Sequence, residues 1–267
     1  MRITSIFPHP IHQIPFLAAA PGRNRVVEGI LPILLAEVDA LPDGLDALIA
    51  TSDLQGIDPK DGYLLGHRVA IELEILADME KIPSPKTTGI VLAGDLYAQT
   101  DKRGGYGDVR EVWQGFSRRF RWVAGVAGNH DRFGDSIPDI KGFKVGRGIH
   151  YLDGDMVEVD GIRIGGISGI IGKPSKPFRR SEKDFRRTLR QLFKELPDIL
   201  ILHESPNDPD NRQMGNESIR SELATASKLL VICGHSHWKV PICDLYNTVQ
   251  VLNVDSRVVV LKVAEPT

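Results

Sequence analysis

Five short apolar segments of this 267-residue chain run into a polar side chain that can bind a metal or a substrate. Segments of this length, separated by turn residues and helical patterns, are typical of buried β-strands in a layered α/β fold. Because ligands of open α/β sheets bind beyond the carboxyl ends of the strands, we expect the five side chains to meet at one edge. The segments are "DALIATS", "GIVLAG", "WVAGVAG", "DILILHE" and "KLLVICG", and the polar residues are Asp53, Asp95, Asn129, His203 and His235.

Helical patterns lie between these segments. Residues 66–81 and 181–196 each carry the apolar stripe of an amphipathic helix, and Ser181–Asp184 has the spacing of a capping box. Asp108 and Glu111 have the same spacing, which predicts that a helix starts at Asp108. Residues 25–40, "RVVEGILPILLAEVDA", predict a helix bent at Pro32.

Other segments favour antiparallel strands. "RITSIF" predicts a first strand, and "IHYLDGDMVEVDGIRIGGISG" predicts hairpins around its "VDGI" turn. The tail, "VQVLNVDSRVVVLKV", predicts a closing hairpin with a bend near Asp255.

Composition excludes several kinds of protein. The net charge is −2, so there is no global basic field to attract nucleic acid. Two cysteines cannot form a disulfide framework, and their use suits a reducing compartment. No stretch approaches the ~20 apolar residues of a membrane span, and the proline-rich N-terminus lacks an apolar signal core. We therefore expect a cytoplasmic protein that does not bind membranes, and the sequence indicates no protein partner.

The candidate site residues combine carboxylates, amides and imidazoles without a thiolate. An aspartate after a strand is commonly a turn or cap residue, and "GNHD" or "HSH" alone could be an ordinary loop. Together these groups suit hard-to-borderline divalent metals. There are too many for one tetrahedral ion, whereas two ions sharing a carboxylate would use them well. The residues are Asp53, Gln55, Asp95, Asn129, His130, Asp131, His203, His235 and His237.

The series "SDLQG", "GDLY", "GNHD", "LILHESP" and "GHSH", spread over about residues 45 to 260, resembles the calcineurin-like metallophosphoesterase superfamily. The resemblance implies an α/β (α+β) fold, a four-layer sandwich of two mixed β-sheets flanked by helices. It also implies one domain over residues 1–267, in which residues 1–44 form an N-terminal extension of strand and helix packed on the core.

The resemblance also implies roles for the site residues. Two divalent metal ions would bind, with manganese favoured and iron, zinc or magnesium as alternatives, and Asp95 would bridge them. Asp53 and His237, with the residue at position 55, would hold the first metal. The second metal would be held by Asn129, His203 and His235. His130 would stabilise charge or protonate the leaving oxygen, and Asp131 would orient it.

One position departs from the family's usual Asp-x-His motif, because Gln55 stands where a histidine is expected. A neutral imidazole is a better ligand for zinc or iron than an amide oxygen, which tends to suit manganese or magnesium. We therefore hypothesise a weakened or differently selective first metal site, with Gln55 Oε1 or a water as the ligand. The alternative is that Gln55 only forms hydrogen bonds.

The reaction implied is hydrolysis of a phosphate ester by a metal-bound hydroxide, with a diester favoured and a nucleotide or nucleic acid as possible substrate. Arg132 and Tyr106 are candidate substrate contacts. The basic residues at 179–190 are either a solvated helix face or a polyanion-binding surface. The rival interpretation is a catalytically weak scaffold that binds other proteins, whose signature would be loss of His130 or of several ligands.

Overall fold

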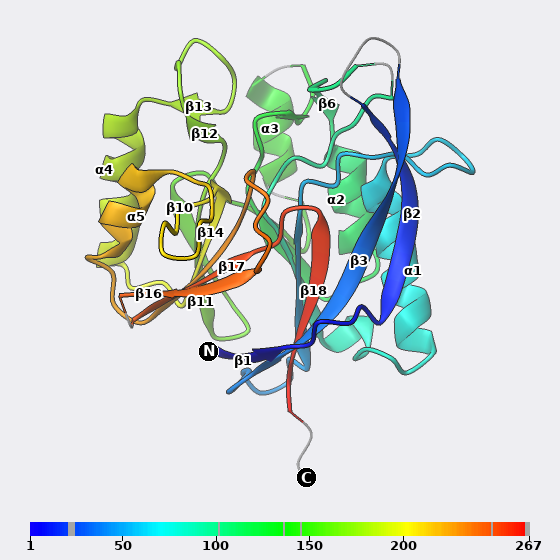
Figure 1. Ribbon diagram of the computed structural model, residues 1–267, viewed down its shortest axis with the longest axis horizontal. Coiled ribbons are helices and arrows are strands. Elements are labelled where there is room, and N and C mark those ends of the chain that lie inside the picture. Colours follow the sequence, from blue (N-terminus) through cyan, green and yellow to red (C-terminus); the bar gives the residue numbers. More distant parts are fainter. Residues whose placement is uncertain (21–24, 101, 136, 145, 247, 265–267) are drawn as a thin grey trace.

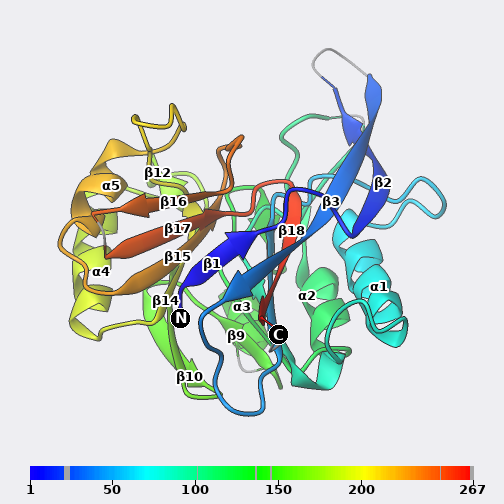
Figure 2. The same ribbon diagram turned by 60° about the horizontal axis from the view of Figure 1, so that its bottom comes forward.

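Two β-sheets packed face to face form the centre of the structure, and helices cover the outer face of each (Figures 1 and 2). The computed structural model describes residues 1–20, 25–100, 102–135, 137–144, 146–246 and 248–264. The eight-stranded sheet has the order β1-β3-β18-β4-β5-β7-β9, with β2 paired to β3, and the six-stranded sheet has the order β10-β11-β14-β15-β17-β16. The predicted four-layer sandwich is confirmed.

The strands of the first sheet are β1 (Ile3–Ile6), β2 (His12–Ala19), β3 (Val26–Val38), β4 (Ala47–Ser52), β5 (Thr88–Leu92), β7 (Trp122–Gly125), β9 (Ile149–Tyr151) and β18 (Arg257–Val263). The strands of the second are β10 (Asp155–Val159), β11 (Ile162–Ile167), β14 (Ile199–Glu204), β15 (Leu229–Gly234), β16 (Ile242–Leu245) and β17 (Val249–Asn253). Two small sheets pair β6 (Gly107–Asp108) with β8 (Asp131–Arg132), and β12 (Ile170–Ile171) with β13 (Arg179–Arg180).

The central strands are buried on both faces. Every residue of β4, β5, β7 and β15 is buried. Alternate residues of β4 face different cores: Ile49 packs toward the helices and Leu48 toward the second sheet. Burial on both faces requires apolar side chains at successive positions. This explains why these strands are continuous apolar runs in the sequence.

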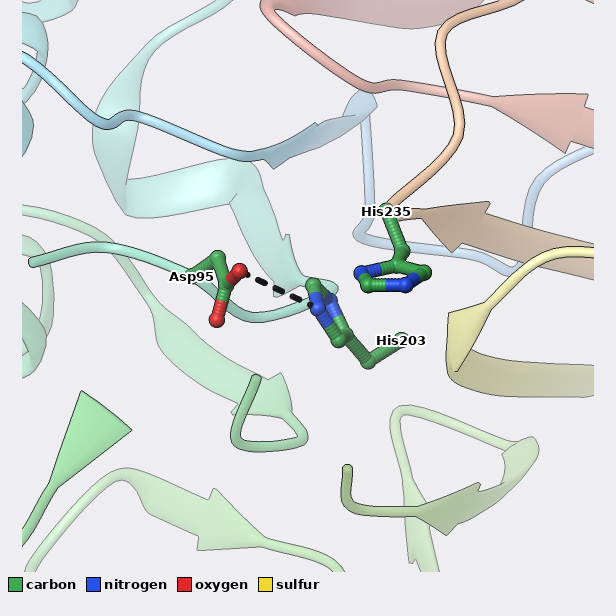
Figure 3. Close-up of side chains that lie close together, drawn as sticks. All are labelled: Asp95, His203 and His235. Atoms are coloured by element: carbon green, nitrogen blue, oxygen red, sulfur yellow. Dashed lines mark ion pairs between the residues drawn. The ribbon is translucent and has the colours of Figure 1, made fainter. Parts of the chain in front are cut away.

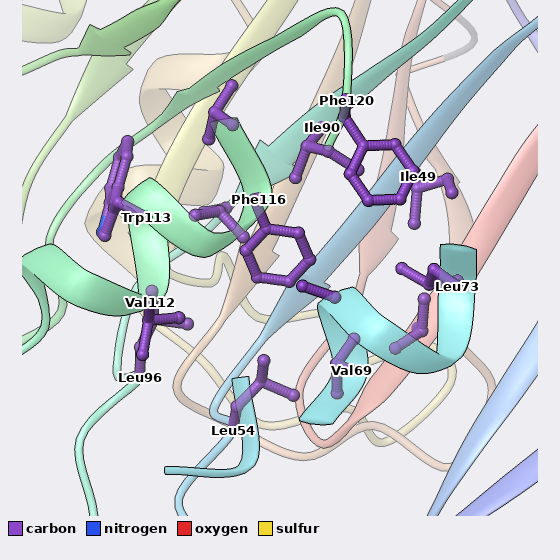
Figure 4. Close-up of a cluster of buried hydrophobic side chains, with 14 of the residues drawn as sticks. Ile49, Leu54, Val69, Leu73, Ile90, Leu96, Val112, Trp113, Phe116 and Phe120 are labelled. Atoms are coloured by element: carbon purple, nitrogen blue, oxygen red, sulfur yellow. The ribbon is translucent and has the colours of Figure 1, made fainter. Parts of the chain in front are cut away.

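Helices α1 (Leu65–Asp78), α2 (Arg110–Ser117) and α3 (Ile137–Lys144) lie on the first sheet, and α4 (Glu182–Lys194) and α5 (Glu217–Leu223) lie on the second. Figure 4 shows Leu73 of α1 and Phe116 of α2 packed with Ile49 and Ile90 of the sheet. A short 3₁₀ helix covers Pro85–Thr87. Among the described residues, no helix combines the length and apolar character needed to span a bilayer.

Two helix starts can be compared with their predicted caps. Helix α4 begins where predicted, because Ser181 Oγ accepts a hydrogen bond from Asp184 N at 3.2 Å. Helix α2 is also present, but its cap is Val109 and not Asp108. The Asp108 carboxylate instead accepts from Arg110 N at 3.0 Å, a local turn that delays the helix by one residue.

The helix predicted for residues 25–40 is wrong, because this segment is the long strand β3. Its apolar residues fit the periodicity of a helix or of a strand, and the available partner strands decide between the two. Strand β3 is antiparallel to β1 and β2 and parallel to β18. Leu31 and Ile33 face the helices, whereas Ala36 and Val38 face the second sheet. Strands β2 and β3 thus form an antiparallel pair, here called the N-terminal arm, which extends beyond the rest of the sheet (Figure 2).

The closing hairpin predicted for the tail is also wrong. Strand β17 belongs to the second sheet, whereas β18 lies between β3 and β4 in the first. The chain therefore crosses between the sheets at residues 254–256, where the predicted bend near Asp255 is found. Strands β10 and β11 do form the expected hairpin, with Asp160 and Gly161 at φ 49° and 74° in its turn.

The basic cluster at 179–190 is largely neutralised within the fold. Arg186 and Arg190 both contact Glu222 of α5, each at 2.6 Å. Arg180 contacts Asp153 at 2.5 Å, and Arg187 contacts Asp184 at 2.8 Å. Arg186 and Arg190 join α4 to α5, Arg187 pairs within its own helix and Arg180 pairs outside it, which favours the structural interpretation over a polyanion-binding surface.

Candidate metal centre

The five predicted strand-end residues are contributed by both sheets. Asp53, Asp95 and Asn129 follow the parallel strands β4, β5 and β7, in that order. His203 lies near the end of β14 and His235 directly follows β15, its parallel neighbour. The candidate centre therefore lies where the carboxyl edges of the two sheets meet.

The turns that carry these residues are strained and tightly packed. Asp53, Asp95 and His235 have φ of 53°, 54° and 66°, a left-handed conformation that costs a non-glycine residue roughly 1–3 kcal/mol. A Cβ at Gly128 would overlap Asp95 Oδ1 and the Asp95 backbone nitrogen, and one at Gly234 would overlap Ser52 Oγ and Asp53 Oδ2. Glycine in the "GNHD" and "GHSH" motifs is thus required for the turns to approach each other.

Asp95, His203 and His235 form the centre of the cluster (Figure 3). One ligand atom from each lies within 4.8 Å of the others, and His203 Nε2 is 3.3 Å from Asp95 Oδ2. His203 Nδ1 donates to the carbonyl oxygen of Ala93 at 2.8 Å. Because that bond fixes the ring, Nε2 is the nitrogen available for a metal.

Two buried side-chain atoms of the predicted ligands make no hydrogen bond among the residues the structure describes. They are Asn129 Oδ1 and His203 Nε2, and the latter has only the ion-pair contact of 3.3 Å with Asp95 Oδ2. A buried polar atom without a partner costs about 1–3 kcal/mol, so such atoms mark sites that a ligand completes. A carboxylate, an amide oxygen and two imidazoles are a donor set that fits a borderline divalent metal.

The electrostatics of the centre favour a bound cation. Burial disfavours the charged form of His203, but the adjacent Asp95 carboxylate outweighs it and raises the pKa of His203 to about 10. Burial, together with the charge on His203, lowers the pKa of His235 to about 4. Without a metal, a proton on His203 balances the carboxylate, and a metal binding at Nε2 would displace it.

Asp53 is held at the other side of the cluster. Its Oδ2 accepts from His235 N at 2.9 Å and from Ser52 Oγ. Burial, and then the charge on Asp255, raise the pKa of Asp53 well above its usual range. Asp53 and Asp255 therefore lie in one electrostatic neighbourhood that a cation would stabilise.

Gln55 and His237 are not oriented as metal ligands beside Asp95. Gln55 Nε2 donates to Asp95 Oδ2 at 3.0 Å, so its amide nitrogen faces the carboxylate. His237 Nδ1 lies 3.2 Å from Asp255 Oδ1, and the Arg257 guanidinium lies 3.3 Å from His237 Nε2. The contact of Gln55 corresponds to the alternative in which it only forms hydrogen bonds.

His130 lies against the same carboxylate. Its backbone nitrogen donates to Asp95 Oδ1 at 2.8 Å, and its Nε2 is 4.0 Å from Asp95 Oδ2. The ring is oriented by the carbonyl of Gly105, which accepts from Nδ1 at 2.9 Å. The expected contact with Asp131 is replaced, because that carboxylate accepts from the backbone nitrogens of Gly128, Asp95 and Leu96 at 2.8–2.9 Å. Asp131 therefore ties together the turns after β5 and β7.

Arg132 and Tyr106, the candidate substrate contacts, lie together beside the cluster. The guanidinium of Arg132 is 4.4 Å from the centre of the Tyr106 ring and 5.9 Å from that of Phe178. Burial lowers the pKa of Arg132. The two residues form a cation–π stack on the side of β6 and β8.

Asp255 and Arg257 are site neighbours that sequence reasoning missed. Arg257 is buried and donates to Trp238 O at 2.7 Å as well as contacting His237. A signal was present for Asp255, since it follows the apolar run "VQVLNV" just as Asp53 follows its own strand. Because the sequence pattern of the tail predicts a hairpin, it places Asp255 in the bend and not at a strand end.

Comparison with known proteins identifies the family. The sequence model of the calcineurin-like phosphoesterase family matches residues 48–239, so the chain belongs to that family. A search of curated protein sequences gave no match.

Solved structures show weak similarity to this chain. Phosphopantetheinyl hydrolase (PptH) from Mycobacterium tuberculosis is 17% identical, with a TM-score of 0.47 over 79% of this chain and 90% of that one. A hypothetical protein from Thermus thermophilus is 14% identical, with a TM-score of 0.46 over 78% and 75%. The sulfate thiohydrolase SoxB from Thermus thermophilus is 13% identical, with a TM-score of 0.44 over 82% and 53%. Similarity at this level specifies neither a substrate nor a reaction.

Proposed function

We propose that the chain is a metal-dependent phosphoesterase whose principal metal position is formed by Asp95, Asn129, His203 and His235. The observation that carries the proposal is the convergence of Asp95, His203 and His235. It is supported by two buried atoms of the proposed ligands that make no hydrogen bond among the described residues, Asn129 Oδ1 and His203 Nε2. A divalent ion, with manganese favoured and iron, zinc or magnesium as alternatives, supplies an acidified water and positive charge toward the phosphoryl group.

A second ion would share Asp95 and lie toward Asp53, Gln55 and His237. In the structure, Gln55 donates to Asp95 and His237 pairs with Asp255, so both must turn to become ligands. We therefore propose that this position binds its ion more weakly. Weak occupancy of the second position is compatible with a dinuclear reaction when the metal is abundant.

The residues of the chain then have distinct tasks. Asp95 organises the centre through both oxygens, and Asp131 holds the turns around it. His130, fixed by the Gly105 carbonyl, directs Nε2 toward the centre, where its imidazolium can protonate the leaving oxygen. A diester is the favoured substrate because "GNHD"-type relatives that the chain resembles often cleave diesters.

His130→Ala tests this proposal. Hydrolysis of p-nitrophenyl phosphate and bis-p-nitrophenyl phosphate with Mn²⁺ should fall about 10²–10⁴-fold, the usual contribution of a general acid. Metal content, measured by mass spectrometry of the purified protein, should not change, because His130 contacts Asp95 through its backbone nitrogen. His9→Ala, at an exposed histidine far along the chain from the motifs, is the matched control.

Full activity of His130→Ala would refute the role given to that side chain. A wild-type protein that binds metal but hydrolyses no phosphate ester with any of the four metals would refute the enzyme proposal. It would then favour the scaffold that binds other proteins.

Gln55→His is expected to strengthen the weaker metal position. An imidazole in place of the amide should increase affinity for the second ion by about 10–100-fold, because a neutral imidazole is the better ligand for Zn²⁺ or Fe²⁺. Calorimetric titration of metal-free protein with Zn²⁺ should show one tight site in the wild type and two in the variant. Two tightly held ions in the wild type would contradict the prediction.

A further inference from the structure

A cleft of about 250 Å³ opens directly beside the candidate metal centre. Asp53 and Gln55 belong to its lining, so it is continuous with the site. Its volume corresponds to about eight water molecules, which is room for part of a substrate. Two segments far apart in the chain form its sides: β2 of the N-terminal arm, and the described residues 97–99 and 102–105 that follow Asp95.

The N-terminal arm forms one side of the cleft, and several contacts hold it in place. The ring of Phe16 lies against the backbone of Gly29 and Gly56, where any Cβ would collide with it. Leu17 exchanges two backbone hydrogen bonds of 2.9 Å with Ile57. Nearer the base, His12 Nε2 lies 3.1 Å from Glu72 Oε2 of α1. Phe16 and Ala18 therefore present a fixed apolar surface to the cleft.

The opposite wall belongs to the segment that orients His130. Gly104 and Gly105 line the cleft, and the carbonyl of Gly105 accepts from His130 Nδ1. A Cβ at Gly104 would lie 3.4 Å from His130 Cε1, so this backbone is in contact range of the imidazole. The cleft thus begins beside the group proposed to protonate the leaving oxygen, which places it on the leaving-group side.

The cleft also carries positive charge and hydrogen-bonding amides. Lys102 and Arg103 line it, together with Gln55 and Gln99. Within the described part of the chain, no carboxylate forms an ion pair with either cation, whereas Arg180 and Arg186 each have an acidic partner. An ammonium and a guanidinium at adjacent positions suit a phosphate, which accepts several charge-assisted hydrogen bonds.

We propose that this cleft is the leaving-group subsite and that it selects a leaving group carrying its own phosphate. The inference rests on the proposed function. Water adds its oxygen to the attacked phosphorus, the bond from phosphorus to the leaving oxygen breaks, and any proton that the leaving oxygen takes up comes from His130. Lys102 and Arg103 bind the second phosphate, and Phe16 and Ala18 contact the rest of the group.

A matched pair of substrates tests the subsite. In diadenosine 5′,5′-diphosphate the leaving group is AMP, whereas in adenylyl-(3′→5′)-adenosine it is adenosine. Lys102→Ala and Arg103→Ala should each lower kcat/KM for the first compound about 10–100-fold more than for the second, since a bond to a charged group is lost. Because each variant is compared with the wild type on the same substrate, the difference in intrinsic reactivity between the two dinucleotides cancels. Lys81→Ala, at an exposed lysine lining a different cavity, should change neither value.

A substitution in the wall provides an independent measurement. Ala18→Trp should fill the cleft and lower hydrolysis of diadenosine diphosphate relative to that of p-nitrophenyl phosphate. Equal losses for both dinucleotides in the Lys102 and Arg103 variants would overturn the subsite. So would a wild type that cleaves p-nitrophenyl phosphate but neither dinucleotide, and that result would leave the proposed function intact.

Binding of AMP separates the two proposals if no substrate is turned over. Calorimetry with metal-loaded protein should show AMP binding that weakens about 10–100-fold in Lys102→Ala and Arg103→Ala. Equal affinity for wild type and variants, or no binding to the wild type, would overturn the subsite. Failure of p-nitrophenyl phosphate hydrolysis alone would count against the function and not against the subsite.

Discussion

Asp95→Asn should abolish tight metal binding and lower hydrolysis by at least about 10³-fold. The amide is isosteric and its oxygen can still accept from His130 N. The nitrogen of the new amide, however, would face Gln55 Nε2 and His203 Nε2. At present the Asp95 carboxylate accepts a hydrogen bond from Gln55 Nε2 and attracts His203 Nε2. Without that charge the centre loses the group that attracts the cation, and with it the ion that would lower the pKa of a bound water.

Mass spectrometry should find less than one ion per chain in purified Asp95→Asn, against at least one in the wild type. The thermal unfolding midpoint of the metal-free variant should be lower than that of the metal-free wild type, because Asp95 forms a buried ion pair with His203 and removing one partner of such a pair is destabilising. Asp210→Asn, at an exposed turn, should match the wild type in both measurements. Retention of a full complement of metal by Asp95→Asn would exclude Asp95 as the central ligand.

Gly128→Ala should disrupt the centre although it removes no functional group. The added methyl would overlap Asp95 Oδ1 and the Asp95 backbone nitrogen, and backbone cannot rotate away as a flexible side chain can. The turns after β5 and β7 would have to separate. This separation would lengthen or break the hydrogen bond of 2.8 Å from Gly128 N to Asp131 Oδ2. We expect a loss of stability of about 1–3 kcal/mol from overpacking, and loss of metal binding.

Gly142→Ala is the matched control for this substitution. Gly142 lies in α3, and a Cβ there would meet nothing within 4 Å. Alanine at this helical position should stabilise the protein by about 0.5–1 kcal/mol. Urea unfolding of both variants, with metal content measured in parallel, checks the pair. A Gly128→Ala protein with unchanged stability and metal content would show that the close approach of the turns is not required.

The prediction of the fold from sequence succeeded where the signal was local. Strands β4, β5, β7, β14 and β15 carry unbroken apolar runs because both of their faces are buried. It failed for β3, whose apolar residues fit either a helix or a strand, and for the tail. In both cases the outcome depends on which distant strand is the partner: β18 pairs with β3 and β4, neither of which is near it in the sequence.

The prediction of the site divides in the same way. Asp95, His203 and His235 converge as their strand ends predicted. The partner of His130 could not be predicted, because Gly105 has no side chain to signal its role. The orientations of Gln55 and His237 depend on Asp95, Asp255 and Arg257, each of which lies on another turn.

The sequence by itself determined which groups stand at the strand ends and that their chemistry suits a divalent metal. Apolar runs, turn glycines and adjacent polar residues act over a few positions, so their consequences can be read locally. Only the tertiary structure decided how those groups are oriented and what encloses them. The bond from His235 N to Asp53 joins residues 182 positions apart, and the N-terminal arm forms a wall of the cleft through contacts with Gly56 and Ile57. Such contacts depend on the packing of the whole chain.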